Sequence, residues 1–271
     1  MRVLRIVSAI TLVTLLVVGG AFVGVRAWSH GGRLPLRPWV IGFIALDAAL
    51  LYGTFEPRAA LFGRVLWRGR ADRPAVAITF DDGPNEPYTS QILDVLRAFD
   101  VKATFFVLGA KVERFPAAAQ RAVEEGHEVG NHTYDHQLLP LKSSRFITHQ
   151  LRITSDGIKR VTGTRPRLFR APHGWRNPWV DRVARREGCI TVAWTIGVYD
   201  TARPGVNCII ERALKGLKNG CILLLHDGRG VEAAPDASQV VEALPVILRE
   251  ARRRGYRLVT VSELADDAKA G

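Results

Sequence analysis

Two adjacent carboxylates, Asp81 and Asp82, stand where a short apolar run of the chain ends. The preceding residues, Ala75–Phe80, are β-prone and mostly apolar, as in a buried strand, and Gly83-Pro84 then interrupts the run. Neighbouring residues on a strand point to opposite faces, so the two aspartates can take different chemical roles. Two like charges this close repel each other unless a cation or an arginine lies beside them. The segment therefore predicts either a metal-binding strand end or an ordinary Asp-Gly turn.

A pair of histidines further along the chain offers the remaining metal ligands. His132 and His136 are four residues apart, a spacing that would place both imidazoles on one side of a helical turn. Two imidazoles and one carboxylate leave a fourth position for water, which is typical of catalytic rather than structural zinc. Together with one carboxylate of the Asp81-Asp82 pair they predict a divalent metal site. The alternative is a surface histidine pair that binds no metal.

Five motifs, in order along residues 74–262, resemble those of the polysaccharide deacetylases, the NodB-homology domain of carbohydrate esterase family four. They are Thr79–Pro84 (TFDDGP), His132–His136 (HTYDH), Arg170–Gly174 (RAPHG), a partial Trp194–Asp200 (WTIGVYD) and Leu223–Asp227 (LLLHD).

The resemblance implies hydrolysis of N-acetyl groups on an amino-sugar polymer such as peptidoglycan or a chitin-like glycan. Asp82, His132 and His136 would hold the divalent ion, with zinc first and cobalt or manganese as alternatives. Asp81 would be the general base, while the ion polarises the acetyl carbonyl and activates water. An O-acetyl polysaccharide esterase and a non-catalytic glycan-binding module on the same fold are the alternative functions.

The later motifs imply the remaining catalytic roles. His226 would be the general acid, because its ordinary pKa near 6.5 lets it carry a proton near neutral pH. Asp200 would orient His226, and Arg170 would keep Asp81 ionised. The backbone N–H of His173, which replaces the usual tyrosine, would stabilise the oxyanion.

The fourth motif departs from the family pattern. The positions that usually hold a second acidic residue and a tryptophan are Gly197 and Thr201 here. Leu224 lies two residues before the expected general acid, hence on the same strand face, and would line the acetyl pocket. That pocket is expected to be more open, or to be filled by Trp175 or Trp179 from the preceding loop.

Short apolar runs alternate with amphipathic helical stretches through this region, which predicts an α/β fold with a parallel sheet. The family fold, a distorted (β/α) barrel, agrees, and every motif falls at the carboxyl end of an expected strand, where barrel enzymes build active sites. The expected strands are Ala75–Phe80, Lys102–Leu108, His127–Gly130, Arg167–Arg170, Cys189–Thr195, Cys221–His226 and Arg257–Val261.

Two apolar stretches precede this region. Ile6–Val25 contains 20 uncharged residues, long enough to span a bilayer, although a cleaved signal peptide has a similar layout. Trp39–Phe55 is a second candidate span, interrupted by Asp47, whose charge is costly at mid-span unless it is paired. We expect a membrane segment over residues 1–55, a basic linker over 56–73 and the catalytic domain over 74–265. Because the implied substrate is an envelope glycan, we expect the catalytic domain outside the membrane.

The net charge of +12 is concentrated near the N-terminus, since residues 1–73 hold 10 basic and 3 acidic side chains. This pattern suits anionic lipid headgroups. The basic residues show no aromatic interleaving or nucleic-acid-binding motif, so no nucleic acid is expected as a partner. We expect a monomer that binds an acetylated polysaccharide. The three cysteines, Cys189, Cys208 and Cys221, are expected as free thiols, with a disulfide as the alternative.

Overall fold

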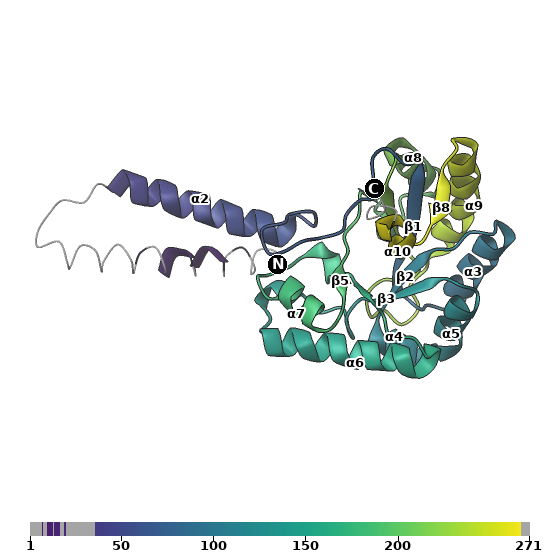
Figure 1. Ribbon diagram of the computed structural model, residues 1–271, viewed down its shortest axis with the longest axis horizontal. Coiled ribbons are helices and arrows are strands. Elements are labelled where there is room, and N and C mark those ends of the chain that lie inside the picture. The colour runs from purple at the N-terminus through teal and green to yellow at the C-terminus, as the bar shows by residue number, and fades with distance from the viewer. Residues whose placement is uncertain (1–6, 8–9, 13, 17–18, 20–35, 267–271) are drawn as a thin grey trace, which may run out of the picture.

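The computed structural model describes residues 7, 10–12, 14–16, 19 and 36–266 (Figure 1). Its strands are β1 (Ala75–Gly83), β2 (Thr104–Val107), β3 (Glu128–Asn131), β4 (Leu168–Phe169), β5 (Ile190–Thr191), β6 (Ile196–Gly197), β7 (Cys221–His226) and β8 (Arg257–Val259). Its α-helices are α2 (Leu36–Phe55), α3 (Tyr88–Ala98), α4 (Gly109–Arg114), α5 (Pro116–Glu124), α6 (Ser144–Thr162), α7 (Val180–Arg186), α8 (Val206–Gly216), α9 (Ser238–Arg253) and α10 (Val261–Asp266). Three short 3₁₀ helices, η1 (Leu139–Leu141), η2 (Pro172–Gly174) and η3 (Asp200–Ala202), lie in the loops.

The strands form one parallel sheet in the order β5-β4-β3-β2-β1-β7-β6, with β8 paired to the start of β1. The two edge strands, β5 and β6, are consecutive in the chain, so the segment between them runs from one edge of the sheet to the other. The stretch around Leu66 also bridges this opening, since Leu66 pairs with Val192 and Arg68 pairs with Cys221. The sheet is therefore curled into an irregular barrel, which confirms the predicted distorted (β/α) fold.

Alternation along the strands separates two apolar cores. Val76, Ile78 and Phe80 of β1 pack outward against α3, α8 and α9, whereas Ala75 and Ala77 face the barrel interior. The same alternation on β7 places Leu223 and Leu225 on the outer face and Ile222 on the inner face. Because side chains alternate, Asp81 lies on the interior face of β1, and Leu224 and His226 lie on the interior face of β7.

Most of the expected strands are present, but the expected strand Cys189–Thr195 is wrong. The chain forms β5 and β6 instead, and the residues between them cross the barrel opening: Val192 N–H donates to Phe169 on one side, and Thr195 N–H donates to Ile222 on the other. A segment that bonds to opposite edges of the sheet cannot remain one straight strand. Cys189, Cys208 and Cys221 are all free thiols, as expected.

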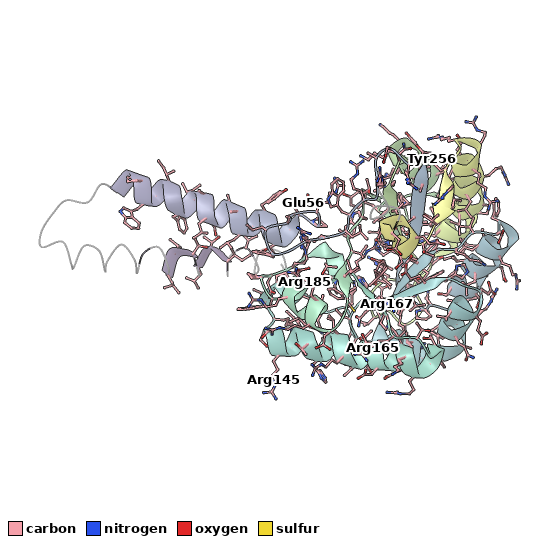
Figure 2. All side chains as sticks on the ribbon, viewed as in Figure 1. Glu56, Arg145, Arg165, Arg167, Arg185 and Tyr256 are labelled. Carbon is pink, nitrogen blue, oxygen red and sulfur yellow. The ribbon has the colours of Figure 1, made fainter. Side chains whose placement is uncertain are left out.

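The stretch 56–73, expected as a linker, is packed against the barrel. The buried guanidinium of Arg176 donates to the carbonyl of Ala59 at 2.6 Å, and Arg58 donates to the carbonyl of Thr195 at 2.8 Å. Gly69 N–H donates to the carbonyl of Gly220. Figure 2 shows how densely side chains fill the barrel region, while Arg145 of α6 points outward from it.

Among the described residues, one helix is long and apolar enough to cross a membrane. It is α2, over Pro38–Phe55, and only 11% of this stretch is buried. It projects away from the barrel (Figure 1). Asp47, the charge within this candidate span, accepts a hydrogen bond from Thr11 at 3.0 Å, so the two apolar stretches meet there. Much of the first expected span, Ile6–Val25, lies outside the described residues.

Candidate active site

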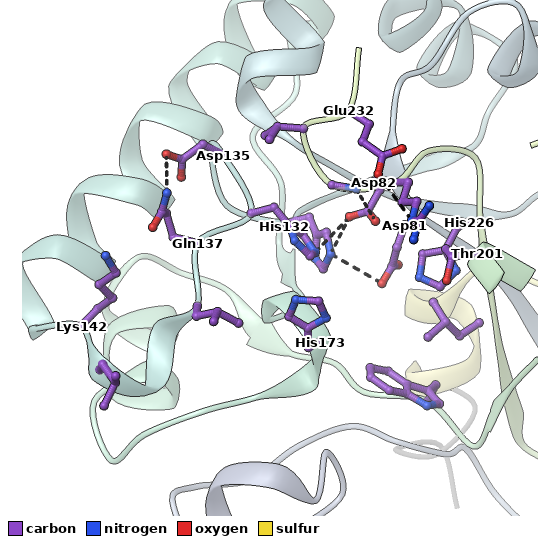
Figure 3. A pocket seen from close by; sticks show the side chains of 18 residues that line it. Asp81, Asp82, His132, Asp135, Gln137, Lys142, His173, Thr201, His226 and Glu232 are labelled. Atoms are coloured by element: carbon purple, nitrogen blue, oxygen red, sulfur yellow. Dashed lines mark hydrogen bonds and ion pairs between the residues drawn. The ribbon is translucent and has the colours of Figure 1, made fainter. Parts of the chain in front are cut away.

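The motif residues converge at the carboxyl ends of the strands, around a cleft of about 910 Å³ (Figure 3). Asp81 and Asp82 end β1, His226 ends β7, and the two histidines of the second motif follow β3. Strand ends meet there because parallel strands direct their following loops to one edge of the sheet. Of the nine predicted site residues, seven line this cleft; Arg170 and Asp200 lie behind it and contact residues that do.

Asp82, His132 and His136 form a compact group of ligand atoms that all lie within 4.8 Å of one another. The Oδ1 atom of Asp82 is 3.3 Å from Nε2 of His132 and 3.2 Å from Nε2 of His136. Asp82 is able to turn toward them because its backbone adopts a left-handed φ of 71°, where the pairing of β1 with β2 is irregular.

This group fits a divalent cation. Asp82 Oδ1 is buried and has no hydrogen-bond partner in the described structure, while Oδ2 accepts from Gly230 N–H at 2.8 Å. His132 Nδ1 lies 2.8 Å from the carbonyl of Arg170, which must accept the bond, so the lone pair of Nε2 faces the site. Burial lowers the pKa of His136 to about 3, which keeps that imidazole neutral and able to ligate.

The charges at the site also favour a cation. Burial raises the pKa of Asp82, but the neighbouring imidazoles outweigh it and hold this pKa below its ordinary value. Burial lowers the pKa of His132, yet the carboxylates of Asp81 and Asp82 outweigh burial and raise it. A buried pair of carboxylates thus favours positive charge at this point, which a bound cation supplies.

The turn that carries His132 and His136 is not the helical turn expected from their spacing. It is an irregular loop in which Thr133 and His136 have φ values of 72° and 58°. Asn131 holds it in place, because its Oδ1 accepts from Thr133 N–H and its Nδ2 donates to the carbonyl of Leu151. Asn131 was not predicted as a site residue. The one feature of the sequence that could have indicated its role is its position directly before His132.

Asp81 and Arg170 form a buried ion pair, with Nη1 of Arg170 2.5 Å from Oδ1 of Asp81. Arg170 is fixed in turn by the hydroxyl of Thr79 and the carbonyl of Ala193, and its guanidinium lies over the ring of Phe106. The other oxygen of Asp81 is 3.8 Å from Nε2 of His132, so it faces the candidate metal site.

His226 lies on the other side of the cleft and is held by Asp200. One Asp200 oxygen accepts from the His226 backbone N–H at 2.7 Å, and the other lies 2.9 Å from Nδ1. Burial lowers the pKa of His226, but the carboxylate of Asp200, with smaller contributions from Asp82 and Asp81, outweighs burial and raises this pKa to about 9. The imidazole therefore carries a proton at neutral pH, and Nε2 remains for the substrate.

The acyl-pocket prediction was partly wrong. Leu224 and Thr201 do line the cleft, but the tryptophan there is Trp194, not Trp175 or Trp179. Trp179 is 45% exposed, and Trp175 packs between Phe55 at the end of α2 and the ring of His173. His173, at a φ of 58°, lies against His136 with ring centroids 4.8 Å apart.

Three further residues near Asp82, namely Lys111, Asp227 and Gly228, were not predicted as part of the site. Burial raises the pKa of Asp227 to about 7, and its Oδ2 accepts from the hydroxyl of Thr89 at 2.6 Å. Lys111 is buried nearby, and burial lowers its pKa. Gly228 packs closely against Asp82, because a Cβ at Gly228 would lie 2.1 Å from the backbone oxygen of Asp82.

Comparisons with known proteins place these motifs in context. A family model described as polysaccharide deacetylase matches residues 68–192. The chain is 41% identical over 206 residues to a peptidoglycan-N-acetylglucosamine deacetylase of Bacillus cereus, covering 74% of this chain and 93% of that protein. It is 34% identical to a peptidoglycan-N-acetylglucosamine deacetylase of Listeria monocytogenes over 70% of this chain, but spans only 38% of that longer protein.

Among solved structures, a CE4 family pseudoenzyme from Bacillus anthracis matches with a TM-score of 0.69 and 30% identity. The match covers 74% of this chain and 68% of the pseudoenzyme. The fold is therefore shared by proteins that are catalytic by name and by one that is named a pseudoenzyme.

Proposed function

This chain belongs to the polysaccharide deacetylase family, and we propose that it is a metal-dependent hydrolase that removes N-acetyl groups from an amino-sugar polymer of the cell envelope. The single observation that carries the proposal is the convergence of Asp82, His132 and His136 in one cleft with Asp81, the proposed base, and His226, the proposed acid. The names of the matched relatives favour peptidoglycan as the polymer.

The proposed chemistry divides between the two sides of the cleft. A divalent ion held by Asp82, His132 and His136, most simply zinc, would polarise the acyl carbonyl and lower the pKa of water. Asp81, oriented by Arg170, accepts the proton of the attacking water through the oxygen that faces the site. His226 donates its Nε2 proton to the leaving amine, while Asp200 fixes its tautomer through Nδ1.

Acetate release tests this proposal. The full chain, purified in detergent, is incubated with N-acetylated chitin and peptidoglycan fragments after loading with zinc, cobalt or manganese, and after chelation. We expect release that depends on metal, and a loss of about 100- to 10,000-fold in rate for Asp81→Asn with metal retained. Near-normal turnover by that variant would remove Asp81 from the mechanism.

Two other functions are separated by the same assay. The match to a pseudoenzyme gives a specific reason to test a non-catalytic glycan-binding module. Binding of glycan without release of acetate from any substrate would favour the module. Release from O-acetylated xylan but not from N-acetylated glycans would favour an O-acetyl esterase.

We also propose that α2 anchors the enzyme in the membrane with the catalytic domain outside and the protein monomeric. The exposed apolar surface of α2 and the Thr11–Asp47 hydrogen bond, which pairs the one acidic group of that helix, support an anchor. A reporter enzyme fused to the C-terminus, active only outside the cytoplasm, tests the orientation. Two spans with the N-terminus in the cytoplasm would instead leave the reporter silent.

A further inference from the structure

The wall of the cleft beside His226 has an unusual composition. Leu224 precedes His226 by two residues on the interior face of β7, and Thr201 follows the histidine's partner Asp200 on η3. Figure 3 shows Thr201 next to His226, facing the same cleft. Trp194 completes this wall.

The position of this wall makes it the acyl pocket, if the proposed function holds. The attacked carbon of an amide has three substituents. Its oxygen must face the cation ligands, and its nitrogen must face the acid His226. The third substituent, which is the methyl group of an acetyl, then points away from both, toward the wall of Trp194, Thr201 and Leu224.

Trp194 fits into the wall because two glycines border its indole. A Cβ at Gly197 would lie 3.3 Å from Nε1 of Trp194, and a Cβ at Gly174 would lie 2.7 Å from Cη2. Side chains at either position would press on the ring, and Gly174 also has a left-handed φ of 71°. The two glycines therefore leave room for the indole in this wall.

Thr201 makes the wall partly polar. Its hydroxyl forms no hydrogen bond with any residue in the described part of the chain, and Thr201 lines the cleft. A hydroxyl in such a place can pair with a polar group on the substrate. A bulky residue at the same position would close that space.

We propose that this enzyme removes N-glycolyl groups as well as N-acetyl groups, with Thr201 as the residue that admits the extra hydroxyl. In the step, water adds to the acyl carbon, the C–N bond breaks, and the proton from His226 goes to the leaving amine. The products are the free amino sugar and glycolate, and no oxidant or reductant is required.

The test compares kcat/KM for N-glycolyl and N-acetyl oligosaccharides of the same sugar and length, using the full chain loaded with zinc. We expect the wild-type ratio of glycolyl to acetyl to be about 0.3 or higher. Thr201→Val keeps the shape but removes the hydroxyl, so the ratio should fall about 2- to 10-fold, the range of one neutral hydrogen bond. Thr201→Trp should lower it further, by more than about 100-fold, because the ring fills the space.

Thr148→Val on α6 is the matched control, since this residue does not line the cleft, and it should leave the ratio unchanged. A wild-type ratio below the expected range, or the same ratio in Thr201→Val as in wild type, would overturn the inference while leaving acetyl hydrolysis intact.

A binding measurement separates this inference from the proposed function. The affinities of the same two oligosaccharides are measured by calorimetry with Asp81→Asn, which retains the metal ligands, and with the double variant Asp81→Asn/Thr201→Val. A lower glycolyl-to-acetyl affinity ratio in the double variant than in Asp81→Asn supports the pocket even if no hydrolysis is ever seen. The same affinity ratio in both proteins refutes it even if acetate is released.

Discussion

Replacing Asp200 with asparagine should move the alkaline limb of the pH–rate profile to lower pH. In the wild-type protein the Asp200 carboxylate outweighs burial and raises the pKa of His226 to about 9, so the acid form persists to that pH. The difference from an ordinary value near 6.5 corresponds to about 3 kcal/mol of stabilisation of the protonated imidazole. Without the carboxylate only burial and the more distant aspartates remain, and we expect the pKa to fall to about 6.5 or below.

The lower pKa of His226 in Asp200→Asn should bring the loss of activity to a lower pH. A general acid is active in its protonated form, so activity is lost as pH rises through its pKa. At pH 7.5 His226 is almost fully protonated in wild type but only about one-tenth protonated at a pKa of 6.5. The profile of Asp200→Asn should therefore decline from near neutrality, with partial recovery as the pH falls. A bound cation lowers the pKa in both proteins, so the difference between the two profiles is the measured quantity.

The assay is kcat/KM for acetate release from a chitin oligomer between pH 5.5 and 10, with both proteins saturated with zinc. Asp156→Asn is the matched control, because Asp156 pairs with Arg165 on the exposed side of α6, and its alkaline limb should stay in place. An unchanged limb in Asp200→Asn would refute the assignment of His226 as an acid tuned by Asp200.

Other predictions test the metal group, its packing and the domain boundary. His132→Ala should lose both tight zinc binding and turnover, measured by metal analysis of the purified protein; stoichiometric zinc would contradict its role as a ligand. Gly228→Ala should destabilise the protein by about 1–3 kcal/mol and weaken zinc binding, because its Cβ would lie 2.1 Å from a backbone oxygen. In contrast, Gly157→Ala in α6 meets nothing within 4 Å and should be neutral or stabilising in thermal melts. A fragment of residues 56–271 should fold, whereas 74–271 should melt at a lower temperature because it lacks the stretch that bridges the barrel; equal melting temperatures would disprove this boundary.

Much of the site could be predicted from the sequence because strand periodicity and motif order are local properties. The alternation on β7 places Leu224 and His226 on one face, as their spacing of two predicts. Residue types alone predicted a metal site shared by the histidine pair and the Asp81-Asp82 pair. The choice of Asp82 as the ligand required the resemblance to a known family, since Asp82 and His132 are joined only through the pairing of β1, β2 and β3.

The parts that sequence analysis missed depend on distant contacts. The turn after β3 departs from a helix because Gly109 and Ala110 donate to the carbonyls of Thr133 and Tyr134. These bonds come from the start of α4, more than 20 residues away in the chain, and no local pattern reports them. Trp194 could not be placed either, because its position depends on Gly174 from another loop.

The three buried carboxylates of the site differ in their charge partners. Asp81 has Arg170 at 2.5 Å, and Asp200 has His226 at 2.9 Å. Among the described residues, no lysine or arginine lies within 4.0 Å of Asp82, whose Oδ1 is buried and lacks a hydrogen-bond donor. A metal ion at Asp82 would supply the charge that this buried carboxylate lacks. Under the proposed function, Arg170 and Asp200 pair with the base and the acid, so the ion, the proton acceptor and the proton donor would each have a separate place in the cleft.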